Sequence, residues 1–165
     1  MGDCAICLES LDAPGLGRKT LPCGHALHEN CAFQMRRKGA KASCPLCRAE
    51  CPELASVEVL FKKAVTLEVR KSFTEAFCLY LEILDVDPEN VAATSNLGVM
   101  YSEGRGVAQD FQKALELYHA AHDAGNRCAT FNLGVMYEQG RGVAQDFQKA
   151  LELYHAAHDA GHRSA

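Results

Sequence analysis

The first 47 residues contain eight side chains that can bind a metal ion. In chain order these are Cys4, Cys7, Cys23, His25, His28, Cys31, Cys44 and Cys47. A Cys-x-x-Cys pair at each end encloses a central Cys-x-His-x-x-His-x-x-Cys segment. Thiolate and imidazole ligands together favour Zn²⁺, and four of them complete one tetrahedral shell. Eight ligands therefore predict two zinc ions with no open coordination position, which indicates structural rather than catalytic metal.

The ligand spacing over residues 3–50 resembles the RING finger family, in the variant with histidine at the fourth and fifth ligand positions. This resemblance implies that the two zinc sites interleave along the chain. Site one would comprise Cys4, Cys7, His28 and Cys31, and site two Cys23, His25, Cys44 and Cys47. The PHD finger also binds two zinc ions, but it usually has an aromatic residue two positions before its last pair, where this chain has Ala42. The RING interpretation is therefore preferred.

RING ubiquitin ligases dock a ubiquitin-conjugating enzyme in a shallow groove between the zinc loops and the central helix. The positions that match this groove are Ile6, Met35 and Pro45. Ile6 and Pro45 agree with the family, whereas Met35 stands where tryptophan is frequent, and this chain contains no tryptophan. Methionine offers a soft apolar contact, so the resemblance implies docking that is weaker or selects different conjugating enzymes.

Arg48 directly follows the last ligand. In active members of the family a cationic residue at this place contacts both ubiquitin and the conjugating enzyme, and a planar guanidinium suits such bridging. The alternative is an ordinary solvated arginine. No residue of the finger is expected to attack the thioester, so catalysis would consist of positioning the reactants.

Composition and charge restrict the class of protein. The chain of 165 residues is 48% hydrophobic with a net charge of −4, and its apolar stretches are too short to span a bilayer. The first ligand at residue 4 leaves no room for a signal peptide. Three further cysteines, Cys51, Cys78 and Cys128, show no spacing logic, and the last two are expected to be buried. We expect a reducing compartment, cytosol or nucleus.

Basic residues near the end of the finger raise the question of nucleic acid. Arg36, Arg37, Lys38 and Lys41 form a positive cluster. Such a run more often forms the solvated face of a short helix, and no aromatic residues are interleaved with it. Nucleic acid is therefore not favoured as a partner.

The second half of the chain repeats with a period of 36 residues: residues 96–129 and 132–165 are identical at 30 of 34 positions. This period indicates a helical solenoid. Each unit is predicted to contain two helices joined by a glycine-containing loop. The predicted inner faces carry Leu97, Met100 and Tyr101 on the first helix, and Ala114, Leu117, Tyr118 and Ala121 on the second. Asp110 is the expected N-cap of the second helix, and Gly125 is expected to end it.

These units resemble Sel-one-like repeats, which are relatives of tetratricopeptide repeats. The matching residues include Leu97-Gly98, Gly104-x-Gly106-Val107 and Lys113-Ala114. Upstream, a diverged tetratricopeptide-like helix pair is expected, opened by Pro52 and containing a capping box from Ser72 to Glu75. The expected domains are a RING-type finger at 1–50, this helix pair at 53–88, and repeats at 90–125 and 126–165. Because no polar capping helix follows the last unit, we expect another chain to cover that end, or the sequence to be truncated.

The predicted fold is a small zinc-stabilised RING finger, with a short β-hairpin, one helix and irregular loops, followed by an all-α helical-repeat solenoid. The two resemblances imply a RING-type ubiquitin ligase that docks a conjugating enzyme carrying ubiquitin and recruits a protein substrate or adaptor on its repeats. The alternative is a non-catalytic zinc-binding scaffold for protein interaction. A zinc hydrolase or redox enzyme is disfavoured, because every predicted metal position is filled and no lone thiol has an activating neighbour.

Overall fold

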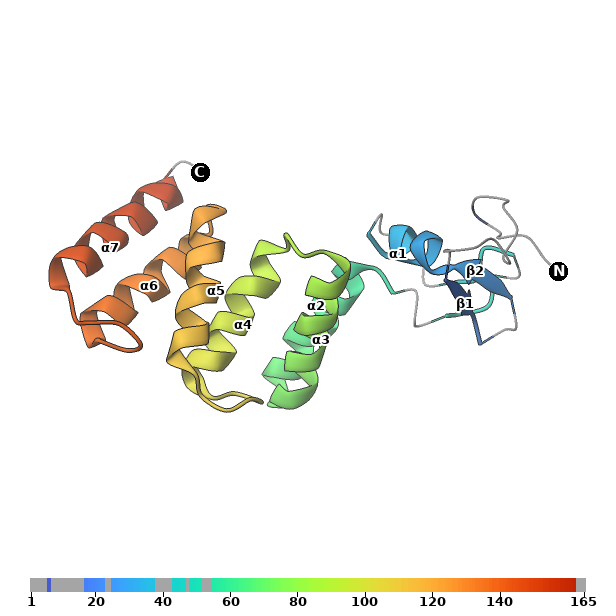
Figure 1. Cartoon of the computed structure of the whole chain (residues 1–165), viewed down its shortest axis with the longest axis horizontal. Coiled ribbons are helices and arrows are strands. Elements are labelled where there is room, and N and C mark those ends of the chain that lie inside the picture. Colours follow the sequence, from blue (N-terminus) through green and yellow to red (C-terminus); the bar gives the residue numbers. More distant parts are fainter. Residues whose placement is uncertain are drawn as a thin grey trace. The chain divides into compact units, whose positions relative to one another are not determined.

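A computed structural model describes residues 6, 17–22, 25–37, 43–46, 48–51 and 55–162 (Figure 1). The chain divides into two compact units, residues 1–62 and residues 63–165. Each unit is described below by itself. Within the described part of the chain, every helix is too short or too polar to cross a lipid bilayer.

The first unit is built on an antiparallel hairpin followed by a helix. Strand β1 (Arg18–Thr20) pairs with β2 (Ala26–His28), with Arg18 opposite His28, and α1 (Glu29–Arg37) continues directly from β2. All three residues of β2 are buried. The Leu21 amide donates to the His25 carbonyl at 2.7 Å, which closes the turn between the strands. The predicted hairpin and single helix are therefore confirmed.

A small core supports this hairpin. It comprises Leu21, Ala26, Leu27, Ala32, Cys44 and Cys51, with Cys31 and Met35 packed against it. The amide of Glu29 at the start of α1 donates to the Gly17 carbonyl at 2.7 Å. An acidic residue in the first turn and two arginines in the last turn suit the helix dipole. Of the six described residues in this core, two are alanines and two are cysteines.

The remaining helices run antiparallel to one another along the chain (Figure 1). They are α2 (Val57–Val69), α3 (Phe73–Val86), α4 (Val91–Glu103), α5 (Phe111–Asp123), α6 (Arg127–Gln139) and α7 (Phe147–His162). Helix α4 pairs with α5 and α6 pairs with α7, while α6 also packs on α5. This arrangement confirms the predicted helical-repeat fold.

Equivalent side chains begin and end the helices of the two repeats. The Asn90 and Asn126 side chains accept the amides of the third residue of α4 and α6. Asp110 accepts the Lys113 amide at 3.0 Å, so it is the N-cap of α5 as predicted. Gly104 ends α4 with φ 68°, in the left-handed region that favours glycine. The 36-residue period is therefore visible in the backbone as well as in the sequence.

The loop of each repeat fits closely against the second helix of the preceding helix pair. A Cβ added at Gly106, whose φ is 73°, would lie 2.4 Å from the Phe73 carbonyl carbon. The Arg105 guanidinium lies over the Phe73 ring, 5.5 Å from its centroid. Gly142 and Arg141 repeat both features against Phe111. Glycine is therefore required at this loop position by contact as well as by conformation.

Four details of the repeats differ from the sequence predictions. In α5 the buried leucine is Leu115, whereas Leu117 is only half-buried. Ser72 precedes α3, but its side chain makes no capping hydrogen bond. Cys78 and Cys128 are exposed rather than buried. Pro52 lies outside the described residues, and the described helix α2 begins later, at Val57.

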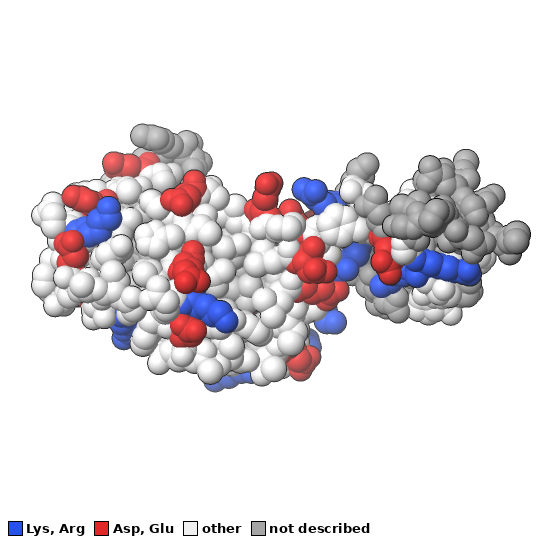
Figure 2. All heavy atoms as spheres, in the orientation of Figure 1, with Lys and Arg blue, Asp and Glu red and all other residues white. Residues whose placement is uncertain are grey.

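Charged side chains on the helical unit are dispersed. On the face drawn in Figure 2, acidic and basic groups over the helices lie in small groups among neutral atoms. Residues 51–165 carry ten Lys and Arg against sixteen Asp and Glu. A basic stripe of the kind that binds nucleic acid is thus not visible over the helices on this face.

Candidate metal centre

Four of the eight predicted metal ligands belong to the described residues: His25, His28, Cys31 and Cys44. The other four, Cys4, Cys7, Cys23 and Cys47, lie outside them. Within the part that is described, no group of three or more His, Cys, Asp or Glu side chains gathers in metal-binding geometry. The fit to zinc is therefore tested below on the described ligands alone.

His25 and Cys44 meet although 19 residues separate them. The Nδ1 atom of His25 lies 3.6 Å from the Sγ atom of Cys44. Zinc bound tetrahedrally, at about 2.0–2.1 Å from nitrogen and about 2.3 Å from sulfur, would hold these two atoms roughly 3.5 Å apart. The imidazole nitrogen is a ligand of borderline softness and the thiolate sulfur is a soft ligand, and Zn²⁺ binds both types. Both the distance and the donor types therefore fit two ligands of one zinc ion.

The backbone explains how these two side chains reach each other. His25 is the last residue before β2, and its carbonyl is fixed by the Leu21 amide. Cys44 lies in a short turn, in which the Arg48 amide donates to the Cys44 carbonyl at 2.8 Å. The Cys44 amide donates to the Ala49 carbonyl, also at 2.8 Å. A hydrogen-bonded turn thus presents the Cys44 thiol toward the hairpin.

His28 and Cys31 occupy the junction between β2 and α1. His28 is the last residue of β2 and is 1% exposed, while Cys31 lies three residues later in the first turn of α1 and is half-buried. Burying a polar ring normally requires a partner, and His28 does make interactions in the structure. A continuous strand-to-helix junction therefore carries both of these predicted ligands of site one.

The residues predicted to dock a conjugating enzyme differ in exposure. Ile6 is 43% exposed, and Pro45 and Arg48 are also exposed. Met35 is half-buried because it packs against the core of the first unit. The structure brings Pro45 and Arg48 into the same turn, next to Cys44.

Sequence reasoning missed one residue of this turn. Leu46, between Pro45 and Cys47, is 57% exposed. The turn therefore holds two neighbouring exposed apolar side chains, Pro45 and Leu46. The position of Leu46 inside the last Cys-x-x-Cys pair, matching that of Ile6 inside the first pair, was the available signal.

Two family models of known proteins match this chain. Residues 2–48 match the family model of the Ring finger domain. Residues 91–126 and 129–162 match the model of the Sel1 repeat. The chain carries a Ring finger domain followed by two Sel1 repeats. A Ring finger domain implies zinc binding, and Sel1 repeats mediate interactions between proteins.

Two solved structures resemble more than half of this chain. A Sel1 repeat protein from Oxalobacter formigenes is 31% identical, with a TM-score of 0.52; the match covers 60% of this chain and 40% of that one. A protective antigen of uropathogenic Escherichia coli strains, which displays an SLR fold, is 25% identical, with a TM-score of 0.57, over 64% of this chain and 23% of that one. This chain thus spans less than half the length of either relative.

Proposed function

We propose that this chain is a RING-type ubiquitin ligase whose finger docks a charged ubiquitin-conjugating enzyme and whose repeats recruit a protein substrate or adaptor. The observation that carries the proposal is the Cys44–Arg48 turn. It holds a predicted zinc ligand, two exposed apolar residues and an exposed guanidinium within five residues. A family match alone would leave the activity open, and the exposed apolar residues and guanidinium of this turn support the proposed docking and positioning.

The finger is proposed to hold two zinc ions. Site one would be formed by Cys4, Cys7, His28 and Cys31, and site two by Cys23, His25, Cys44 and Cys47. The 3.6 Å separation of His25 Nδ1 and Cys44 Sγ supports the second assignment. Zinc bound by four protein ligands supplies folding free energy and no reactive position. Its role is to fix the loops that bear the docking residues.

The exposed apolar side chains are proposed to form the docking surface. Ile6 and Leu46 are both exposed, at 43% and 57%, and Pro45 restricts the backbone of the Cys44–Arg48 turn that carries Leu46. Together with the exposed edge of Met35 they would contact apolar loops of the conjugating enzyme. Because Ile6 and Leu46 are only about half exposed, burial of the remaining surface would contribute roughly 1 kcal/mol for each side chain.

Arg48 is proposed to hold the charged complex in a reactive arrangement. Its φ of 60° is left-handed, a conformation that costs a non-glycine residue about 1–2 kcal/mol. An arginine held in this conformation, with its side chain in solvent, suggests that the guanidinium serves a contact. Its planar donors can bridge carbonyl groups of ubiquitin and of the conjugating enzyme at once.

The transfer itself would involve no covalent bond to this chain. A lysine amine of the substrate attacks the thioester carbonyl on the conjugating enzyme, an isopeptide bond forms, the carbon–sulfur bond breaks, and the cysteine thiol is released. Restricting the freedom of the thioester accelerates this step by positioning. The chain's contribution is therefore to dock, to orient and to bring the substrate close.

A non-catalytic scaffold is the second candidate, and one observation favours it. Met35 is half-buried in the finger core, so it offers less docking area than an exposed tryptophan would. In that case the zinc sites would only fold the finger, and the repeats would bind proteins without any transfer of ubiquitin.

A self-ubiquitination assay with a panel of conjugating enzymes separates the two candidates. The wild-type chain should be modified with at least one enzyme, and Ile6→Ala should reduce the rate at least tenfold. Leu81→Ala is the matched control, because Leu81 is also exposed (45%) but lies on α3. Absence of transfer with every enzyme would establish the scaffold, and full activity of Ile6→Ala would refute the docking surface.

The zinc ligands can be tested with two buried cysteines of the same core. Cys44 and Cys51 are both fully buried, but only Cys44 is a proposed ligand; the Cys51 thiol donates to the Ala49 carbonyl at 3.4 Å. Native mass spectrometry should find two zinc ions on the wild type and on Cys51→Ser, and fewer on Cys44→Ser. Equal zinc content in both variants would overturn the assignment of Cys44.

A further inference from the structure

A small cavity opens between α4, α5 and α6, inside the pair of repeats. Its volume is about 220 Å³, which suits one side chain rather than a helix. Apolar side chains, among them Val99 and Met136, surround the polar groups of Ser102, Tyr118, Asn132 and Arg141. The lining residues belong to α4, α5, α6 and the loop after α6, so this α4–α6 cavity is formed by the described repeats whatever packs on α7.

A tyrosine lies at the equivalent place in the second helix of each helix pair, and in two of the three pairs its hydroxyl donates to a glutamate. The Tyr80 hydroxyl lies 2.5 Å from Oε1 of Glu68, and the Tyr154 hydroxyl lies 2.6 Å from Oε2 of Glu138. Tyr118, in the middle pair, is the exception: among the described side chains, no carboxylate accepts its hydroxyl hydrogen. The middle pair therefore lacks an acceptor that both of its neighbours have.

The Tyr118 hydroxyl has weaker partners in the cavity. Oγ of Ser102 lies 3.2 Å away, beyond the usual O–H···O separation of about 2.7–2.8 Å. The Ser102 hydroxyl itself donates to the Val99 carbonyl at 3.0 Å, so Ser102 only accepts from Tyr118. Asn132 also hydrogen-bonds Tyr118, and its amide nitrogen carries a second hydrogen. Burial raises the pKa of Tyr118, so its hydroxyl stays protonated and able to donate.

The arginine at the edge of the cavity also lacks an acidic partner. In the first repeat, Nε of Arg105 lies 2.5 Å from Oε2 of Glu103. In the second repeat Gln139 replaces this glutamate, and no carboxylate in the described part of the chain pairs with Arg141. The Arg141 guanidinium lies over the Phe111 ring, 5.6 Å from its centroid, and both residues line the cavity. A cation is thus held at the cavity without an ion pair.

Both features come from adjacent positions in the sequence. Residues 102–103 are Ser-Glu, whereas residues 138–139 are Glu-Gln, and these are two of only four differences in 34 aligned positions. The first exchange leaves Tyr118 without a carboxylate, and the second leaves Arg141 without one. Two otherwise nearly identical repeats therefore differ at the residues that determine which hydrogen-bond donors of this cavity are paired with acids.

We propose that the α4–α6 cavity binds the carboxylate of a glutamate side chain from a partner protein. Tyr118, Asn132 and Arg141 would donate to its oxygens, and its two methylene groups would pack on the apolar walls. Glutamate is the side chain that reaches the equivalent tyrosine in both neighbouring pairs. Charge-assisted hydrogen bonds of this type are roughly twice as strong as neutral ones. The inference deepens the proposed recruitment of a protein by the repeats and rests on that part of the proposed function.

One acidic side chain at the cavity opposes this charge. Glu103 also lines the cavity, but its carboxylate pairs with the Arg105 guanidinium. Because this pair is neutral, Arg141 decides the sign of the charge that the cavity favours. An anionic group is therefore preferred over a cationic one, and rising salt concentration should weaken its binding.

The test is a titration of the full-length chain with acetyl-Ala-Ala-Glu-Ala-Ala-amide, followed by nuclear magnetic resonance of the Asn132 side-chain amide. This signal should shift saturably, because the carboxylate accepts from the amide. The same peptide with glutamine in place of glutamate should bind about tenfold more weakly, since a hydrogen bond to a charged group contributes more. Acetylated pentaalanine with a free carboxyl end, whose anion lacks the methylene stem, should bind as weakly as the glutamine peptide.

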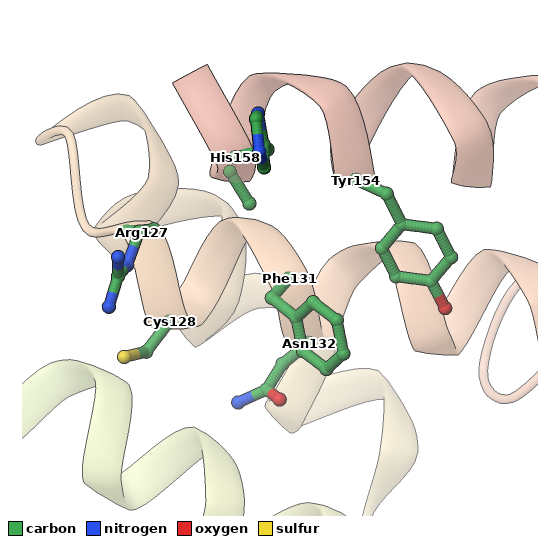
Figure 3. Close-up of a pocket in the computed structure, with 7 residues that line it drawn as sticks. Arg127, Cys128, Phe131, Asn132, Tyr154 and His158 are labelled. Atoms are coloured by element: carbon green, nitrogen blue, oxygen red, sulfur yellow. The ribbon is translucent and has the colours of Figure 1, made fainter. Parts of the chain in front are cut away.

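Two substitutions remove the proposed donors and leave the apolar walls in place. Tyr118→Phe and Arg141→Gln should each weaken binding of the glutamate peptide about tenfold. The matched controls are Tyr154→Phe, whose hydroxyl already donates to a carboxylate, and Arg127→Gln. Both control residues line a different hollow, the last groove of the array, at Phe131 between α6 and α7 (Figure 3). Both controls should bind the peptide as the wild type does.

Ser102→Glu gives a second, independent test. It supplies a carboxylate at the position that Glu138 occupies in the next repeat. The Tyr118 hydroxyl then has an acceptor from its own chain, so the glutamate peptide should no longer bind. Thermal unfolding of this variant should stay unchanged or shift upward, which separates a filled cavity from a damaged fold.

The other outcomes would overturn the proposal. These are equal affinities for the glutamate and glutamine peptides, absence of a saturable shift with the glutamate peptide, wild-type affinity of Ser102→Glu, and an equal loss of binding in the two controls. Tighter binding of the pentaalanine peptide would identify a chain terminus as the ligand instead. No conjugating enzyme takes part in this titration, so its failure and a failure of the self-ubiquitination assay are distinguishable.

Discussion

The finger and the repeats of this chain differ in the side chains that form their hydrophobic cores. Among the described residues, the finger core contains Leu21, Leu27 and four smaller side chains. The core shared by the two repeats contains Leu115, Tyr118, Leu133, Met136 and Leu153 in addition to its alanines. A segment as small as the finger cannot bury enough apolar surface to fold alone. The difference indicates that metal ligation holds the finger, whereas packing between neighbouring helices holds the repeats.

Removal of the metal should produce the largest difference in stability between the two units. A structural zinc site contributes on the order of 10 kcal/mol to folding, so a chelator should abolish hydrogen-exchange protection in β1, β2 and α1. The amides of α4 to α7 should keep their protection, because packing and not zinc holds them. If the hairpin stayed protected after zinc had demonstrably been removed, the contrast between the units would be wrong.

The next largest loss of stability is expected when a methyl group is added to the closely packed glycine of a repeat loop. Gly106→Ala adds a methyl group 2.4 Å from a backbone carbon at φ 73°, and strain plus overpacking should cost about 4 kcal/mol. Gly125→Ala is the control: its φ is 83°, yet an added Cβ would meet nothing within 4 Å. Its cost should be roughly 1–2 kcal/mol, from conformation alone. Urea unfolding followed by circular dichroism measures both, and equal losses would show that contact with Phe73 contributes nothing.

Two leucines at equivalent positions test the role of the neighbour. Leu115→Ala should destabilise the repeats by about 2.5 kcal/mol, because it opens a cavity in a covered face. Leu151→Ala, identical in local sequence but 50% exposed, should cost about 0.5 kcal/mol or less. The same unfolding measurement applies, and a large loss for Leu151→Ala would mean that the last repeat is already covered.

The smallest effect concerns the ionisation of Tyr154. The pKa of Tyr154 is raised from 10.0 to about 12. Burial is the largest cause, followed by the hydrogen bond to Glu138 and then by the negative charge of Glu138. Because the folded-state pKa is the higher one, this stabilising contribution is complete below pH 10 and declines as the pH rises through 12. Phenolate absorbance should lose a component that titrates near pH 12 in Tyr154→Phe, and Glu138→Gln should lower the pKa of Tyr154. If Tyr154→Phe lost a component near pH 10 instead, the raised pKa of Tyr154 would be contradicted.

Much of the repeat fold could be predicted because each helix carries its own signals. The 36-residue period, the Asp110 cap and the glycine at residue 125 depend on local sequence, and the structure has them where predicted. Burial of individual side chains depends instead on neighbouring helices. Periodicity could not choose between Leu115 and Leu117, nor could it show that Cys128 faces solvent at the edge of the last groove.

The finger was less predictable beyond its ligands. Spacing alone predicted eight ligands, but their pairing came only from the family resemblance. Among the described residues, the proximity of His25 and Cys44 supports one such pair. Exposure of Leu46 depends on a turn closed by the Arg48 amide, although its place inside the last Cys-x-x-Cys pair was a sequence signal for this residue. The groove at Phe131 did have a sequence signal, since Phe131 and Ser95 differ within nearly identical repeats.

Single-turnover discharge of ubiquitin from a preloaded conjugating enzyme to free lysine tests the central claim most directly. With saturating wild-type chain the discharge should accelerate, and with Arg48→Ala it should slow roughly tenfold or more, equivalent to at least about 1.4 kcal/mol of the barrier. Binding of the uncharged conjugating enzyme should change little. If Arg48→Ala discharged ubiquitin as fast as the wild type, or lost docking altogether, the claim that the finger positions the thioester through this arginine would be contradicted.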